Sequence, residues 1–237
     1  MWKIKSSTII RNELAHYREN ELIFANELFR KHLTGHITEA AFYKMLERMY
    51  SSGELGKAAR GIYYIPSVSK YGIVPLSDSQ IVEAFTKQET GMVVGYSMYN
   101  SLNLTTQVSK TVNVLSSAID GFSKTIRNVA VKQIPLEFSD EVKNMVSGLE
   151  VLQNFYEIQD MDYVAFIDFS KKLAADYKNE VFEIVISKTS YKKSTISFLR
   201  EILRYYEVAN SLDRHLSALS TYKHPRMEEI YEIARVS

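Results

Sequence analysis

The chain has 237 residues, with 29 Lys and Arg, 28 Asp and Glu and no cysteine. The missing cysteine excludes disulfides, thiolate catalysis and cysteine-ligated zinc, and no apolar run approaches the ~20 residues that span a bilayer. Residues 1–5 lack the long apolar core of a secretory signal, so we expect a cytoplasmic protein.

Charge is unevenly distributed along the chain. Residues 1–72 carry 11 Lys and Arg against 7 Asp and Glu, whereas the remaining residues carry 18 against 21. A basic front part beside a mildly acidic remainder indicates that the front part is the one that meets a polyanion.

Three helical patterns open the chain. Apolar residues recur at spacings of three and four over 8–17 and again over 21–33. Gly35 suits the left-handed residue that follows a helix end. Thr38 is a predicted N-cap, because its hydroxyl accepts from an otherwise unpaired backbone N–H, and it introduces a third helix over 39–52.

The hydrophobic period then changes. Residues 54–65 predict a hairpin with a basic loop over 56–61 and a β-branched and aromatic strand over 62–65, which Pro66 ends. Three helices followed by a basic hairpin are in the order of a winged helix-turn-helix. We therefore predict such a DNA-binding domain over residues 1–70.

A linker and a second domain follow. Breakers at Pro66, Gly72 and Pro75 predict a linker over 66–78, and the second domain is expected over 73–237, α/β to about residue 135 and helical beyond. The predicted fold class is therefore α+β and mostly helical. The elements predicted in this part are helices over 78–88 and 96–102, strands over 92–95, 111–116 and 128–134, and helices over 142–157, 162–177, 179–187, 192–206 and 208–219.

The third helix carries the predicted DNA contacts. With Phe42 at the centre of its buried side, Ala40, Lys44, Glu47 and Ser51 fall opposite at 100° per residue. The N-terminal residues of a recognition helix reach base edges, while cations nearby contact phosphates. The predicted DNA-binding residues are Thr38, Ala40, Tyr43 and Lys44 at the base-reading end, Arg48 at phosphate, and Lys57 and Arg60 on the hairpin tip.

Two other interpretations of this surface stay open. An exposed helix stripe with Lys and Arg is often only a solvated face. Winged-helix domains also serve as protein-interaction modules, so the fold alone does not fix the function.

Two segments resemble a known family. Residues 53–66, GELGKAARGIYYIP, and residues 95–108, GYSMYNSLNLTTQV, are similar to the AbiEi-type antitoxins. The resemblance covers residues 8–135, and the helical last third matches in general character only. It implies an antitoxin of a type IV toxin–antitoxin (abortive infection) pair, not an enzyme. In that family the N-terminal winged helix binds inverted repeats in double-stranded DNA and represses its own operon. The C-terminal domain counteracts a nucleotidyltransferase-like toxin without a stable complex.

Residues 96–108 also have a plain structural interpretation. Leu102 and Leu104 are expected to pack beneath the sheet, while Thr105, Thr106 and Gln107 satisfy backbone groups of the following loop. The alternative is a functional surface.

Two groups of polar residues raise other functions. His32 and His36 are four apart, but Gly35 between them ends the helix, so we expect no metal. Asp160, Asp162 and Asp168 resemble a nuclease cluster, but the first two open a predicted helix, where carboxylates are stabilised. We expect no catalytic residue and no cofactor.

Two further alternatives concern the second domain. It is a candidate for sensing a small molecule in an apolar pocket, which would make the chain an effector-responsive regulator. Two lysine pairs, Lys171-Lys172 and Lys192-Lys193, are interpreted as solvated helix positions, with a second nucleic-acid surface as the alternative.

Overall fold

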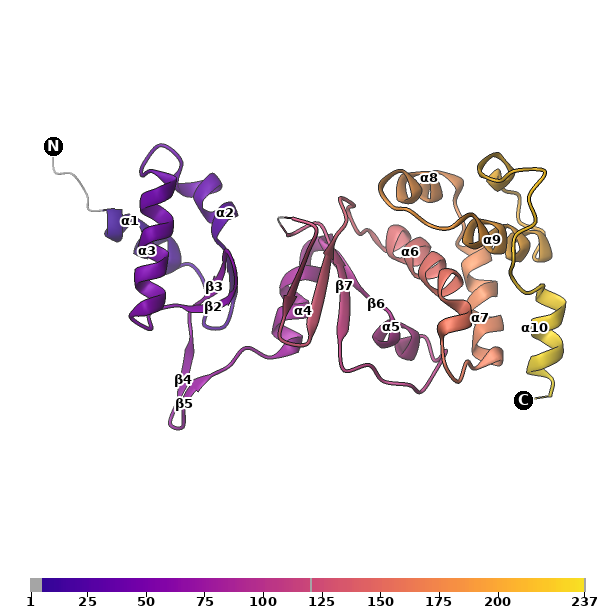
Figure 1. The fold of residues 1–237 in the computed structure, drawn as a ribbon, viewed down its shortest axis with the longest axis horizontal. Helices are drawn as coiled ribbons and strands as arrows, with labels where there is room; N and C mark the ends of the chain where they lie inside the picture. Colours follow the sequence, from indigo (N-terminus) through magenta and orange to yellow (C-terminus); the bar gives the residue numbers. More distant parts are fainter. Residues whose placement is uncertain (1–5, 120, 237) are drawn as a thin grey trace. The chain divides into compact units, whose positions relative to one another are not determined.

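The computed structural model describes residues 6–119 and 121–236 and has an α+β fold (Figure 1). The predicted absence of a secretory signal rests on residues 1–5, which lie outside the described residues. The chain divides into two compact units: unit 1 spans residues 1–84 with 124–127, and unit 2 spans 85–123 with 128–237. In the part of the chain that the structure describes, no helix is long and apolar enough to cross a bilayer.

The described part of unit 1 begins with three helical segments and a three-stranded sheet. In chain order these are α1 (Ser6–Leu14), β1 (Leu22–Phe24), α2 (Ala25–Leu28) with a π-helical turn (Phe29–Leu33), α3 (Glu39–Ser51), β2 (Gly56–Ala59) and β3 (Ile62–Tyr64). The strands are antiparallel in the order β1-β3-β2. Ile10, Ile23, Phe42, Leu46 and Tyr63 join one buried core, which fixes α3 against the sheet.

The helix predicted over 21–33 is wrong at its start. Leu22, Ile23 and Phe24 form β1, which pairs with β3 through Leu22–Tyr64 and Phe24–Ile62. Three consecutive apolar residues fit a strand or a buried helix equally well, and cross-strand pairing decides between them.

The first strand of the hairpin lies later than predicted, because residues 56–59 form β2 instead of a loop and residues 54–55 are not in a strand. Gly56 lies under the ring of Tyr64, where a Cβ would approach Tyr64 Cζ to 2.2 Å. A side chain at this position would displace the Tyr64 ring, which accounts for glycine in a strand despite its low strand preference. The turn is reduced to Arg60 and Gly61, and Gly61 adopts φ +76°.

The predicted linker holds a hairpin of its own. Strands β4 (Ser67–Ser69) and β5 (Gly72–Val74) pair with Val68 opposite Ile73. Helix α4 (Asp78–Thr86) and a 3₁₀ turn (Lys87–Glu89) follow. Ser77, rather than Asp78 or Ser79, caps α4 by accepting from Gln80 N–H at 3.2 Å.

Unit 2 combines a small sheet with a helical layer. Its elements include β6 (Gly91–Val94), α5 (Tyr96–Ser101), β7 (Val112–Ser116) and β9 (Val129–Gln133). Strand β6 is antiparallel to β7, and β7 is parallel to β9. Strand β8 (Ser123–Ile126), which no pattern predicted, precedes β9.

The helical part of unit 2 largely follows the predicted pattern. It comprises α6 (Asp140–Gln153), a 3₁₀ turn (Phe155–Glu157), α7 (Tyr163–Ala175), α8 (Asn179–Lys188), α9 (Lys193–Tyr205), a 3₁₀ turn (Leu212–His215) and α10 (Met227–Ala234). Helix α10 packs along α7 (Figure 1). Asp162 caps α7 by accepting from Ala165 N–H at 2.9 Å, which confirms its predicted structural position.

The helix predicted over 208–219 is wrong. Only Leu212–His215 is helical there, as a 3₁₀ turn, and the last helix is α10 instead. Asp213 binds Arg200 at 2.6 Å and Arg204 at 2.7 Å, both on α9. Leu212 is fully buried, and Val208 and Leu216 pack against the same core, so apolar contacts and these ion pairs hold the segment without helical periodicity.

Candidate nucleic-acid interface

Helix α3 begins at a cap that holds its first turn. Thr38 is extended, and its Oγ1 accepts from Ala41 N–H at 3.3 Å, as predicted. Before it, Gly35 takes φ +85° with open space around it, which also matches the prediction. The turn between α2 and α3 thereby sets the direction of the α3 axis.

The outward face of α3 is exposed as predicted. Phe42, Leu46 and Met49 are buried on the opposite side. Ala40, Lys44, Glu47, Arg48 and Ser51 are all exposed. Among the described residues neither the Lys44 ammonium nor the Arg48 guanidinium has an ion-pair partner, so both charges are available to an anion.

Tyr43 lies between the two faces. It is half-buried, and its ring meets that of Phe42 edge-on with centroids 5.3 Å apart. The predicted base-reading residue is therefore partly committed to the core, and only part of its ring faces outward.

Lys57 is not on the hairpin tip. It lies in β2, and its Nζ is 2.7 Å from Glu47 Oε1 on α3. The same ammonium lies 5.6 Å from the ring centroid of Tyr50 and 5.7 Å from that of Tyr63. The Lys57 ammonium thus forms a tether between hairpin and helix, and its predicted role as a phosphate contact stays a prediction.

Glu47 is the centre of that tether. Its Oε1 also accepts from the Tyr63 hydroxyl at 2.6 Å. The hydrogen bond from Lys57, and then that from Tyr63, lower the pKa of the Glu47 carboxyl. Burial, together with the Glu47 charge, raises the pKa of the Tyr63 phenol. The negative charge of Glu47, in the middle of the exposed α3 face, is therefore balanced by the Lys57 ammonium.

A second ion pair closes the far end of α3. The Arg11 guanidinium of α1 binds both carboxylate oxygens of Glu54, with distances of 2.9 to 3.2 Å. These hydrogen bonds lower the pKa of the Glu54 carboxyl. Glu47 and Glu54 are thus each paired with a cation. Lys44 and Arg48 on α3 and Arg60 at the hairpin turn are exposed, as is the carboxylate of Glu39 in the first turn of α3.

Sequence reasoning missed the exposed ribbon formed by β4 and β5. Val68, Tyr71 and Ile73 are mostly exposed on it, and the Lys70 ammonium lies 4.9 Å from the Tyr71 ring centroid. The alternation of apolar and small polar residues between Pro66 and Pro75 was the available signal, but the three breakers suggested a linker.

The segment over 96–108 makes local and long-range hydrogen bonds. Thr105 Oγ1 accepts from Gln107 N–H at 3.1 Å, as predicted for the local loop. Thr105 is buried, and its Oγ1 donates to Gln159 O at 2.6 Å. The Tyr96 hydroxyl donates to Glu157 O at 3.0 Å and accepts from Gln159 N–H at 3.3 Å. The family-like segment therefore anchors the loop that joins α6 to α7.

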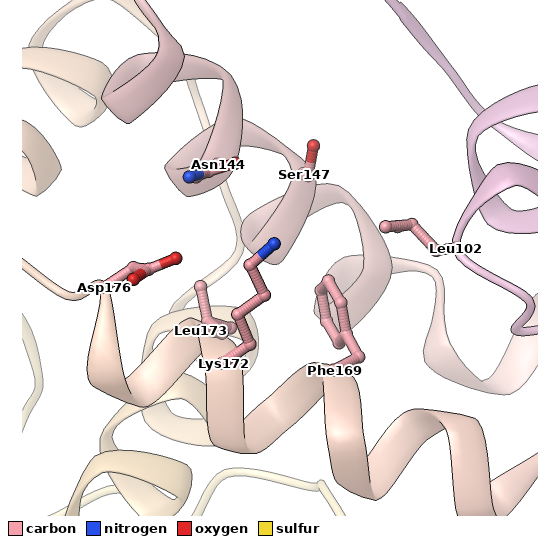
Figure 2. A pocket seen from close by; sticks show the side chains of 7 residues that line it. All are labelled: Leu102, Asn144, Ser147, Phe169, Lys172, Leu173 and Asp176. Carbon is pink, nitrogen blue, oxygen red and sulfur yellow. The ribbon is translucent and has the colours of Figure 1, made fainter.

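A cleft in unit 2 lies between α6 and α7 and encloses about 360 Å³, part of it open to solvent. Figure 2 shows Lys172 and Phe169 rising from α7 toward Asn144 and Ser147 of α6. Asp176, four residues after Lys172, also lines it, so the cleft carries one charge of each sign. Within the described residues no group of three metal-binding side chains is found.

No protein-family model matches the chain, and no curated protein is a significant match.

Proposed function

We propose that unit 1 is a winged helix-turn-helix that binds duplex DNA through the outward face of α3. The observation that carries the proposal is the exposure of Lys44 and Arg48 on that face, without carboxylate partners among the described residues, next to a hairpin whose turn exposes Arg60. The order α1-β1-α2-α3-β2-β3, with β3 between β1 and β2, supports it, because it is the arrangement expected of that domain.

The docking mode follows from α3. A helix fits the major groove, and its N-terminal residues approach the base edges. Ala40 and Thr38 are at that end and are small, so the backbone can approach closely. Lys44 lies one helical turn after Ala40 and can contact a base edge or a phosphate. Arg48, one turn later, can contact a phosphate. Arg60 at the hairpin turn is the outlying cation.

We further propose that the protein is an autorepressor and antitoxin of a type IV toxin–antitoxin pair. This part rests on the resemblance of residues 53–66 and 95–108 to the AbiEi-type antitoxins. It predicts two copies on an inverted repeat upstream of the gene, because operator symmetry mirrors that of the bound proteins. It also predicts a neighbouring nucleotidyltransferase-like toxin whose toxicity unit 2 relieves.

The DNA-binding proposal is tested by gel shift with the DNA upstream of the gene. Lys44→Ala and Arg60→Ala should each weaken binding, whereas Lys188→Ala, which removes an exposed cation from α8 of unit 2, should not. Unchanged affinity in both unit 1 variants would contradict the assignment.

The antitoxin proposal needs a separate test. The neighbouring gene is expressed with the full chain and with a Lys44→Ala, Arg60→Ala double variant. Rescue of growth by both would separate antitoxin action from DNA binding, as proposed. Failure of the full chain to rescue growth would contradict antitoxin action and leave the DNA-binding result as it stands.

A further inference from the structure

A second cleft in unit 2 brings two lysines together. It lies between the end of α6, the 3₁₀ turn Phe155–Glu157, the start of α9 and the segment before α10, and it encloses about 500 Å³, part of it open to solvent. Its lining includes Lys192, Lys223, Tyr156 and Glu157.

Lys192 is held at the mouth of this cleft by α6. Gln153 Oε1 accepts from Lys192 N–H at 3.0 Å and from the Thr195 hydroxyl at 3.5 Å. Lys192 is the N-cap position of α9, and no side chain caps the first turn of that helix. The Lys192 backbone is therefore fixed while its ammonium stays exposed.

Lys223 also lines the cleft, and its neighbour His224 is held in place. The His224 ring stacks on Phe198 of α9, with centroids 5.4 Å apart and planes within 6°. Its Nδ1 lies 3.0 Å from the Pro225 carbonyl oxygen, which can only accept, so Nδ1 carries a hydrogen, and its Nε2 lies 3.0 Å from the Ser197 hydroxyl. These contacts hold the His224 ring in place, which fixes the backbone position of the preceding residue, Lys223.

Tyr156 supplies a flat apolar surface on the third side. Its side chain is 71% exposed, and its ring packs edge-on against Phe155 with centroids 5.4 Å apart. The hydrogen bonds of Tyr96 to Glu157 O and Gln159 N–H hold this turn in place. An exposed tyrosine on an anchored turn is suited to stacking on a planar ring.

The charges select the kind of ligand. Neither Lys192 nor Lys223 makes an ion pair with a carboxylate in the described part of the chain, and Glu157 is the one carboxylate among the described residues that line the cleft. Two cations and one anion leave a small positive excess, which suits a ligand with one phosphate better than a nucleic-acid strand. The Lys172 cleft of Figure 2 lacks this excess, because Asp176 balances its lysine.

We propose that this cleft binds a free nucleoside monophosphate, with the phosphate between Lys192 and Lys223 and the base on Tyr156. The inference goes beyond DNA binding and does not depend on it. Such binding would make unit 2 a sensor of a small phosphorylated metabolite.

Isothermal titration of the full chain with AMP, GMP, CMP and UMP tests the proposal. At least one should bind saturably, and Lys192→Gln and Lys223→Gln should each weaken that binding by at least about tenfold, as for a lost charge-assisted hydrogen bond. Tyr156→Ala should weaken it by about fivefold or more, and Tyr156→Phe should not, because a phenyl ring still stacks. Lys110→Gln, an exposed lysine outside the cleft, is the matched control, and thermal melts check that each variant is folded.

Three results would overturn the inference. One is the absence of saturable binding for all four nucleotides up to about 1 mM. Another is equal affinity in both lysine variants and the Lys110→Gln control. The third is a preference of more than tenfold for a short single-stranded RNA over every mononucleotide. None of these results bears on Lys44, Arg48 or Arg60, so the DNA-binding proposal stands or falls separately.

Discussion

Lys57 on β2 and Glu47 on α3 form an ion pair whose Nζ–Oε1 distance is 2.7 Å. The same carboxylate oxygen accepts from the Tyr63 hydroxyl of β3, so one side chain of the helix binds both strands of the hairpin. This arrangement fixes the hairpin to the exposed face of α3. The Lys57 ammonium also offsets the negative charge of Glu47 on the surface where Lys44 and Arg48 lie.

The Tyr63 hydroxyl should contribute measurably to stability. Tyr63→Phe removes one hydrogen bond without removing the buried ring, so we expect a loss of about 1 kcal/mol in the free energy of unfolding. Urea denaturation followed by circular dichroism measures it. Tyr64→Phe on the same strand is the control and should stay within about 0.5 kcal/mol of the parent. A Tyr63→Phe variant as stable as Tyr64→Phe would show that the bond contributes nothing.

The Glu47 carboxyl should make the stability fall in acid. Because its pKa is lower in the folded chain than its ordinary value of 4.5, the ionised form favours folding above that value. The contribution is lost as the pH falls from 4.5 through the folded-state pKa. Urea midpoints measured between about pH 3 and pH 7 should therefore depend less on pH in Glu47→Gln than in the parent or in Glu83→Gln, an exposed carboxylate of α4. Identical pH profiles of the urea midpoint for all three proteins would contradict the proposed contribution of Glu47.

The start and the exposed face of helix α3 could be predicted from the sequence alone. Its apolar spacing and the Thr38 cap are local signals, and its start and its exposed face agree with them. The exposure of Ala40, Lys44 and Arg48 follows from the same periodicity. Local signals of this kind need no knowledge of the rest of the fold.

The tether and the first strand depend on contacts between distant parts of the chain. Lys57 meets Glu47 only because β2 begins at Gly56, where the missing side chain makes room for Tyr64. Leu22 and its neighbours form a strand because β3, far along the chain, pairs with them. Neither relation is encoded in a window of a few residues, so periodicity alone could not predict them.

Thr105 should be structurally important although it lies in a loop. Thr105→Val keeps the shape but leaves the Gln159 carbonyl and the Gln107 N–H without their hydroxyl partner. We expect a loss of about 1 to 3 kcal/mol in the free energy of unfolding. Thermal or urea unfolding measures it. Thr106→Val, at the exposed neighbouring position, is the control, and equal stability of the two variants would remove the anchoring role.

The salt dependence of DNA binding should distinguish Arg60 from Lys57. A cation that contacts phosphate contributes about 0.9 to the slope of log affinity against log salt. Arg60→Ala should therefore lower the slope by about that amount. Lys57→Ala should lower it less, because the Lys57 charge is paired with Glu47. Fluorescence anisotropy at several salt concentrations gives both slopes, and a larger change in Lys57→Ala would reverse this assignment.

The most direct test of the central claim is where α3 lies on DNA. Because the chain has no cysteine, Ala40→Cys introduces a single thiol for an iron–chelate cleavage probe. With DNA from upstream of the gene, we predict cleavage confined to a few base pairs in each half of an inverted repeat. A Lys188→Cys label on unit 2 serves as the comparison. Absent or evenly spread cleavage from the Ala40→Cys label, on DNA that the labelled protein still binds, would contradict the claim that this face of α3 meets the double helix.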